Sequence, residues 1–210
     1  MEVIAAKSAG FCFGVARAVR MAEELAASAQ CPRMLGDLIH NRRETERLAA
    51  LGLTVIASPE EAEAGDAVLL RAHGVGREVY EALAVRGAQV LDATCPKVKK
   101  AQLAIARATR QGATLLLFGE ADHPEVRGLI SYAHGPAHVF GSQEELNRLR
   151  LNPARAHVLA SQTTQDRNPF SSLEAALRAR FPGLTVLSTI CDATRERQEE
   201  ARSIASSVDV

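Results

Sequence analysis

Short apolar runs alternate with longer amphipathic stretches along the whole chain. Most of the runs are apolar on both faces, which is typical of parallel strands covered by helices. They span residues 1–6, 33–39, 54–57, 67–72, 88–93, 113–119, 137–141, 156–161 and 184–190. Helices are predicted to begin near Val15, Arg42, Pro59, Arg77, Pro96, Pro124, Ser142, Pro169 and Ala193. The alternation predicts an α/β protein built from βα units, with helices on both faces of its sheets.

Three cysteines share one sequence context. Cys12, Cys95 and Cys191 each follow an apolar run and precede a predicted helix. We interpret this as a repeated architecture with a first α/β lobe at 1–95 and a second at 96–190. Residues 191–210 then start a third lobe that is largely missing, because little chain follows Cys191.

Composition narrows the class of protein. Of 210 residues, 47% are hydrophobic and 24% charged, as in soluble globular proteins. Lys+Arg and Asp+Glu both number 25, so no excess positive charge attracts nucleic acid or an anionic membrane. The chain shows no long apolar span and no secretory leader. We therefore expect a cytoplasmic protein with no nucleic-acid or membrane partner, whose cysteines are not in disulfides.

The three cysteines allow several interpretations. Ligands bind beyond the carboxyl ends of strands in open α/β sheets, where helix N-termini also stabilise thiolates. Three convergent thiolates would leave a tetrahedral or cubane metal site one protein ligand short. Three buried structural cysteines remain an equal alternative at this point, since free cysteine is often buried. Cys31 precedes a predicted strand and is expected to be structural.

Histidines follow apolar runs at the same predicted edge. His40, His73 and His123 favour a polar or anionic ligand there, with metal ligation as an alternative. The segment SQTTQ brings Thr163 to another strand end, where hydroxyls and amides can bind phosphate oxygens. Glu125, in HPEV, is the leading candidate for a proton donor beside such a ligand. No convincing nucleotide-binding motif is present.

Seven motifs in order carry a family resemblance. They are AGFCFGVARAV, LGDLIHN, RAHGV, LDATCPKV, HPEV, SQTTQ and TICDATRERQ. Together they closely resemble the LytB/IspH family of 4-hydroxy-3-methylbut-2-enyl diphosphate reductases, from the N-terminus to about Gln198.

The resemblance implies a three-lobed α/β fold around a central [4Fe–4S] cluster, with Cys12, Cys95 and Cys191 as its ligands. It implies an enzyme that removes the substrate's allylic hydroxyl with two electrons and protons, giving isopentenyl and dimethylallyl diphosphate. This is the last step of the methylerythritol phosphate pathway. Ferredoxin or flavodoxin would be the electron donor.

The same resemblance assigns roles to the remaining residues. His40, His73 and His123 match the family's diphosphate-binding and substrate positions. Glu125 matches its proton-delivering glutamate, and Thr163 matches its substrate-contacting threonine.

One departure from the family pattern concerns the C-terminal end. The family continues with a Ser-x-Asn element and a later serine that holds the diphosphate, and this chain ends before both. We therefore expect a truncated enzyme that binds cluster and substrate poorly alone. A zinc site built from cysteines and a histidine, and a metal-free Rossmann-like enzyme, are the minor alternatives.

Overall fold

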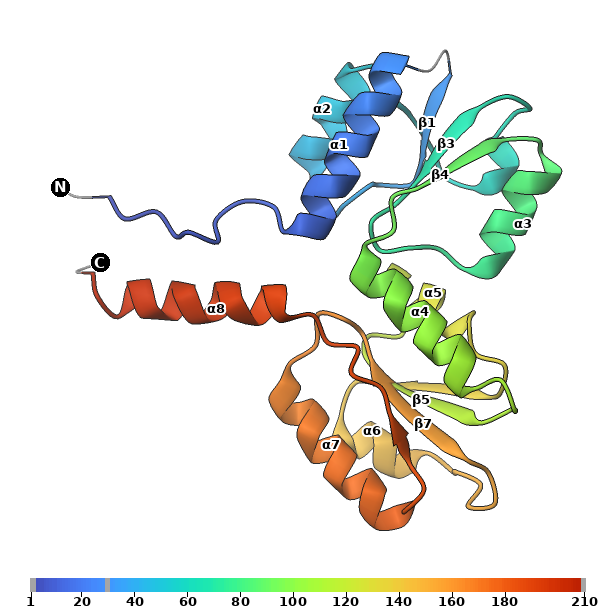
Figure 1. Cartoon of the computed structure of the whole chain (residues 1–210), viewed down its shortest axis with the longest axis vertical. Helices are drawn as coiled ribbons and strands as arrows, with labels where there is room; N and C mark the ends of the chain where they lie inside the picture. Colours follow the sequence, from blue (N-terminus) through green and yellow to red (C-terminus); the bar gives the residue numbers. More distant parts are fainter. Residues whose placement is uncertain (1–2, 29–30, 209–210) are drawn as a thin grey trace.

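The computed structural model describes residues 3–28 and 31–208 and contains two four-stranded sheets (Figure 1). The first has the order β2-β1-β3-β4 and the second the matching order β6-β5-β7-β8. All neighbouring strands are parallel, which confirms the predicted α/β class with small parallel sheets. The strands are β1 (Pro32–Leu35), β2 (Thr54–Ile56), β3 (Ala67–Leu70), β4 (Gln89–Asp92), β5 (Thr114–Phe118), β6 (Ala137–Phe140), β7 (His157–Ser161) and β8 (Thr185–Val186).

Helices lie on both faces of each sheet, as expected. They are α1 (Phe13–Ser28), α2 (Arg42–Ala50), α3 (Arg77–Val85), α4 (Pro96–Ala108), α5 (Pro124–Ile130), α6 (Gln143–Arg148), α7 (Arg167–Arg180) and α8 (Asp192–Ala205), with a 3₁₀ turn, η1 (Pro59–Glu61). None of those in the described ranges is both long and apolar enough to cross a membrane.

Alternation along the strands explains the layers of the first sheet. In β3, Leu69 packs in the core formed with α1 and α2, whereas its neighbours Val68 and Leu70 pack in the core that includes Leu83 of α3. Successive strand residues point to opposite faces, so a fully apolar strand such as β3 serves two cores at once.

The second sheet repeats this arrangement. Leu115 and Leu117 of β5 pack against α4 and α5, and Leu116 and Phe118 pack against α6 and α7. All five residues of β5 are buried. The central strands β3, β5 and β7 are therefore buried on both faces, which removes any polar alternation from them.

The strand order fixes where a site can form. From β1 the chain moves to β2 on one side and then to β3 on the other, and β5 is related to β6 and β7 in the same way. Each sheet therefore has a topological switch point, between β1 and β3 and between β5 and β7. Crevices beyond the carboxyl ends of strands at such points are where open α/β sheets bind ligands.

Some predicted element positions are wrong. Residues 3–6 form no strand, because no neighbouring strand is present to pair with them, and Met1 and Glu2 lie outside the described residues. The strand expected at 184–190 is limited to β8. Helix α7 begins at Arg167 because Asp166 caps it, its carboxylate accepting from Asn168 N at 2.8 Å.

Candidate functional site

Three histidines from separate elements meet between the two sheets' switch points. His40 follows β1, His73 follows β3, and His123 caps the N-terminus of α5 after β5. The ring centroids of His40 and His73 are 4.2 Å apart, and that of His123 lies 5.4 Å from His40 and 5.7 Å from His73. The imidazoles that the sequence placed at one predicted edge thus form a single cluster, which we call the histidine cluster.

The histidine cluster is electrostatically unusual because its rings are close and partly buried. Burial first, and then His40, His123 and Arg71, lower the pKa of His73 to about 4. The pKa of His123 is also lowered, chiefly by burial and then by His40. His73 is therefore neutral at pH 7, and an arriving anion would favour its protonated form.

Arg71 contributes a permanent charge that the sequence reasoning missed. Its Nε donates to the carbonyl oxygen of Gly74 at 3.3 Å, which places the guanidinium beside the backbone that carries His73. Burial, and next the nearby Arg127, lower the pKa of Arg71, but an arginine remains charged at neutral pH. The available signal was a charged residue directly after the fully buried strand β3.

Glu125 lies in the first turn of α5 and is 2% exposed. Thr163 donates to both of its carboxylate oxygens, from the backbone N at 2.6 Å and from Oγ1 at 2.9 Å. The backbone N of Glu125 donates in turn to His123 Nδ1 at 3.1 Å. Burial raises the pKa of Glu125, and the two hydrogen bonds from Thr163 partly oppose that shift. A buried carboxyl group with a raised pKa is suited to store and release a proton.

All three predicted cysteines stand at helix N-termini. Cys95 and Cys191 are the N-cap residues of α4 and α8, and the carbonyl oxygen of Cys12 accepts from Ala16 N at 2.8 Å at the start of α1. The two N-cap thiols make no cap hydrogen bond, and each cysteine is partly exposed. Helix N-termini favour thiolates, which are the form that binds metal.

Backbone hydrogen bonds tie two of the cysteines to the other site residues. Cys95 N donates to the carbonyl oxygen of Ala72, next to His73, at 2.9 Å. Cys191 N donates to the carbonyl oxygen of Thr163 at 2.7 Å. The histidine cluster, Glu125 and these two cysteines therefore belong to one connected region.

Cys12 enters this region through α1. A Cβ placed on the buried Gly14 would lie 2.5 Å from Cys95 Sγ and 3.1 Å from Cys95 Cβ, so the start of α1 lies directly against Cys95. No three Cys, His, Asp or Glu side chains among residues 3–28 and 31–208 converge on a single-ion position.

A hydrogen-bonded network supports the turn before Cys95. Asp92 accepts from Tyr80 Oη at 2.8 Å, from Lys99 Nζ at 2.9 Å and from Thr94 N at 2.9 Å. Tyr80 and Lys99 are further residues that the sequence reasoning missed, because they lie on helices α3 and α4.

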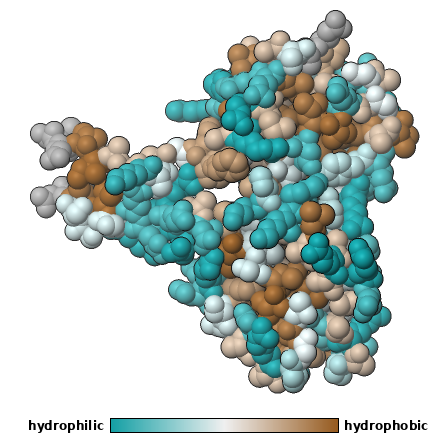
Figure 2. Space-filling view, viewed as in Figure 1, coloured by the Kyte–Doolittle hydropathy of each residue, from teal (hydrophilic) through white to brown (hydrophobic). Residues whose placement is uncertain are grey.

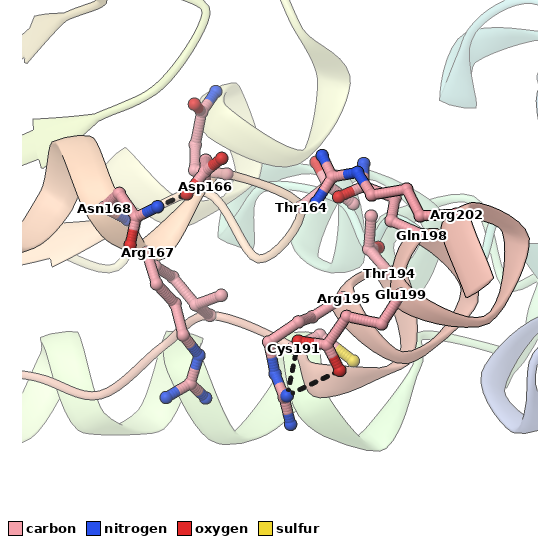
Figure 3. A pocket seen from close by; sticks show the side chains of 12 residues that line it. Thr164, Asp166, Arg167, Asn168, Cys191, Thr194, Arg195, Gln198, Glu199 and Arg202 are labelled. Carbon is pink, nitrogen blue, oxygen red and sulfur yellow. Dashed lines mark hydrogen bonds and ion pairs between the residues drawn. The ribbon is translucent and has the colours of Figure 1, made fainter. Parts of the chain in front are cut away.

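A polar cavity of about 250 Å³ adjoins Cys191 (Figure 3). It lies between the loop after β7 and the first turns of α8, and two of its arginines form ion pairs. Arg167 contacts Asp192 at 2.6 Å and Arg195 contacts Glu199 at 2.9 Å. This cavity makes the Cys191 side of the region accessible from outside.

Cys31, which is expected to be structural, and three further histidines lie outside the histidine cluster. His157 on β7 stacks on Phe181 with ring centroids 4.1 Å apart. The backbone N of His134 donates to Thr109 Oγ1, and His138 lies on β6. Cys31 is exposed before β1.

The fold and the site define an α/β protein with two sheets, a shared histidine and glutamate site, and three cysteines at helix N-termini. The sequence model of the LytB protein family matches residues 3–210. The chain belongs to this family.

Several curated proteins and solved structures resemble the chain. The 4-hydroxy-3-methylbut-2-enyl diphosphate reductase of Desulfovibrio desulfuricans is 56% identical over the whole chain, which spans 76% of that protein. The protein of the same name from Geobacter sulfurreducens is 43% identical, and the chain spans 73% of it.

Two solved structures share the fold. The structure titled as (E)-4-hydroxy-3-methyl-but-2-enyl diphosphate reductase, the terminal enzyme of the non-mevalonate pathway, has a TM-score of 0.84 and 38% identity, covering 99% of this chain and 74% of its own. The reductase of Plasmodium falciparum has a TM-score of 0.87 at 24% identity, covering 94% of this chain and 63% of its own.

Proposed function

We propose that this chain is a 4-hydroxy-3-methylbut-2-enyl diphosphate reductase of the non-mevalonate isoprenoid pathway. The observation that carries the proposal is the continuous link from the histidine cluster through Glu125 and Thr163 to Cys191. The overall reaction replaces the allylic C–OH of the substrate by C–H. It consumes two electrons and two protons and releases water.

The donor set fits an iron–sulfur group. Thiolates are the usual ligands of such clusters, and Cys12, Cys95 and Cys191 lie at three helix N-termini that favour thiolates. Gly14 approaches Cys95 so closely that position 14 of α1 has no room for a side chain. We propose that these three cysteines hold a [4Fe–4S] cluster, which when bound supplies electrons and one iron with an open position.

The histidine cluster would bind the substrate's diphosphate. A neutral imidazole donates one hydrogen bond, and a bound anion would raise the lowered pKa values of His73 and His123. Arg71 adds a fixed positive charge beside them. This explains how a chain with no net charge binds a multiply charged anion.

Glu125 would deliver a proton to the departing hydroxyl. Hydroxide is a poor leaving group, and its protonation to water lowers the barrier to breaking the C–O bond. Burial raises the pKa of Glu125, so this carboxyl group holds its proton more strongly than an exposed glutamate. Thr163 donates to both carboxylate oxygens and would hold the group in place for this transfer.

The proposal includes an architecture and an electron source. Strands β1–β4 precede Cys95 and strands β5–β8 precede Cys191. This order supports a division at 1–95, 96–190 and 191–210. A ferredoxin or a flavodoxin would supply the electrons singly in the cytoplasm, where cysteine thiols stay reduced.

Anaerobic reconstitution tests the proposal. Any iron that the wild-type chain binds should be matched by an equal amount of acid-labile sulfide, and any turnover of the diphosphate substrate should require a reduced viologen donor. The variants C12S, C95S and C191S should each lose iron and turnover, whereas C31S, the matched control, should keep both. Bound zinc without sulfide, or three serine variants as active as the wild type, would contradict the proposal.

A further inference from the structure

The segment of residues 7–10 and helix α8 lie side by side, outside the hydrophobic cores of both sheets (Figure 1). Helix α8 has no buried residue, and hydrophilic side chains cover much of it (Figure 2). Before Cys12, residues 3–11 form no strand, and Val3 and Ile4 are 80% and 51% exposed. Neither element is therefore held in place by apolar burial.

Two side chains of α8 bind the segment. The Glu200 carboxylate accepts from Lys7 N at 2.6 Å and from Ser8 N at 2.8 Å, and it also accepts from the Ser8 hydroxyl. Arg197 Nε donates to the carbonyl oxygen of Ser8 at 3.0 Å, and its Nη2 donates to that of Gly10 at 3.2 Å. We call Arg197 and Glu200 the clasp.

The clasp binds backbone groups that no strand pairs. It pairs two backbone N–H groups and two backbone carbonyls of a segment that turns at Lys7 and Ser8 and has no sheet partner. All of these are charge-assisted hydrogen bonds, which are stronger than neutral ones. Hydrogen bonds from Ser8 and Lys7 accordingly lower the pKa of Glu200.

The clasp acts close to Cys12. Gly10 has a φ of +94°, a conformation that glycine adopts without strain, and the chain turns there just before Cys12. Arg197 holds the carbonyl oxygen of this turn and lies on the helix that Cys191 begins. On its other side Cys12 is fixed by α1, whose Gly14 contacts Cys95.

We infer that Arg197 and Glu200 are positioning residues that hold Cys12 at a fixed position relative to Cys191. The last helix of the chain would thus set the geometry of its first cysteine. The coupling between α8 and Cys12 stands independently of the proposed function. Only the further step, that the fixed position of Cys12 serves a cluster, rests on the proposed function.

Alkylation of the reduced, metal-free chain measures this coupling. Iodoacetamide is added to wild type and R197Q/E200Q, and the modification of each cysteine is followed by peptide mass spectrometry. We expect Cys12 to react about tenfold faster in the variant, because the hydrogen bonds that hold the turn before Cys12 are lost. The exposed Cys31 is the internal reference and should be unchanged.

A matched control removes the same charges from the same helix. Arg195 and Glu199 form an i,i+4 ion pair that does not contact the segment, so R195Q/E199Q reproduces the change in net charge and, because it loses this pair, destabilises the helix at least as much. Amide hydrogen exchange at Lys7 and Ser8 gives a second readout. The variant R197K should show part of the protection from exchange that R197Q/E200Q loses. Because the clasp lies outside the hydrophobic cores of both sheets, the thermal midpoint of R197Q/E200Q should stay close to that of the control.

The possible results separate the two proposals. Faster Cys12 alkylation in R197Q/E200Q alone supports the clasp, even if the wild-type chain takes up no iron and the proposed function fails. Equal Cys12 rates in R197Q/E200Q and R195Q/E199Q overturn the clasp, even if both chains take up iron. Lys7 and Ser8 amides that are unprotected in the wild type overturn it as well.

Discussion

Replacing Gly14 by alanine should separate α1 from Cys95. The new Cβ would lie 2.5 Å from Cys95 Sγ, where an unstrained carbon–sulfur contact is more than 3.5 Å, so the overlap is about 1 Å. Rotation of the thiol does not relieve it fully, because Cys95 Cβ also lies only 3.1 Å away. The helix or the cysteine must shift.

The direction of the change in the free energy of unfolding shows whether the contact with Cys95 or the helix propensity of alanine dominates. Alanine in a helix is favoured over glycine by up to about 1 kcal/mol, whereas overpacking costs about 1–3 kcal/mol. We therefore expect G14A to lower the free energy of unfolding by about 1–2 kcal/mol. The same displacement should reduce iron bound per chain, since it moves two proposed ligands apart.

Urea unfolding of the reduced apo-chain and iron analysis after anaerobic reconstitution measure the two effects. Gly183 is a matched control, because nothing lies within 4 Å of a Cβ built there, and G183A should change neither quantity appreciably. A G14A chain that is as stable as the wild type and binds as much iron would refute the proposed contact between α1 and Cys95.

Three further predictions concern Glu125, His73 and Cys31. Because burial raises the pKa of Glu125, the stability that its protonated form contributes is complete below about pH 4.3 and is lost as the pH rises through the raised value. E125Q should therefore gain stability relative to wild type as the pH rises in urea titrations, while losing turnover. A difference that does not change with pH would contradict the raised pKa. The pKa of His73 is lowered to about 4, so its NMR signals should not titrate between pH 5.5 and 8 until pyrophosphate is added, and a midpoint near 6.5 in the free chain would disprove this. C31S should leave stability within about 0.5 kcal/mol of wild type, since Cys31 is exposed, and a larger loss would show a structural role.

Local patterns identified much of the candidate site. The run AVLLRAH predicts a buried strand followed by His73, and β3 is indeed buried throughout. The proline after Cys95 predicts a helix start, which the structure shows at Pro96. These features are readable because strand burial and helix initiation depend on residues near in sequence.

Other features had no local signal. The sequence interpretation treated residues 1–6 as a strand, yet residues 3–6 have no strand partner. Glu125 was recognisable as a first-turn acid, but its burial against Thr163 was not. Both depend on which elements become neighbours, and periodicity carries no such information.

By itself, the sequence determined the alternation of strands and helices, the parallel α/β class and the residues able to bind a metal or an anion. Tertiary structure alone decided that His40, His73 and His123 form one cluster, because only the matching switch points of the two sheets bring them together. It also decided that α8 binds the start of the chain, since Lys7 and Glu200 become hydrogen-bond partners only after the chain has folded.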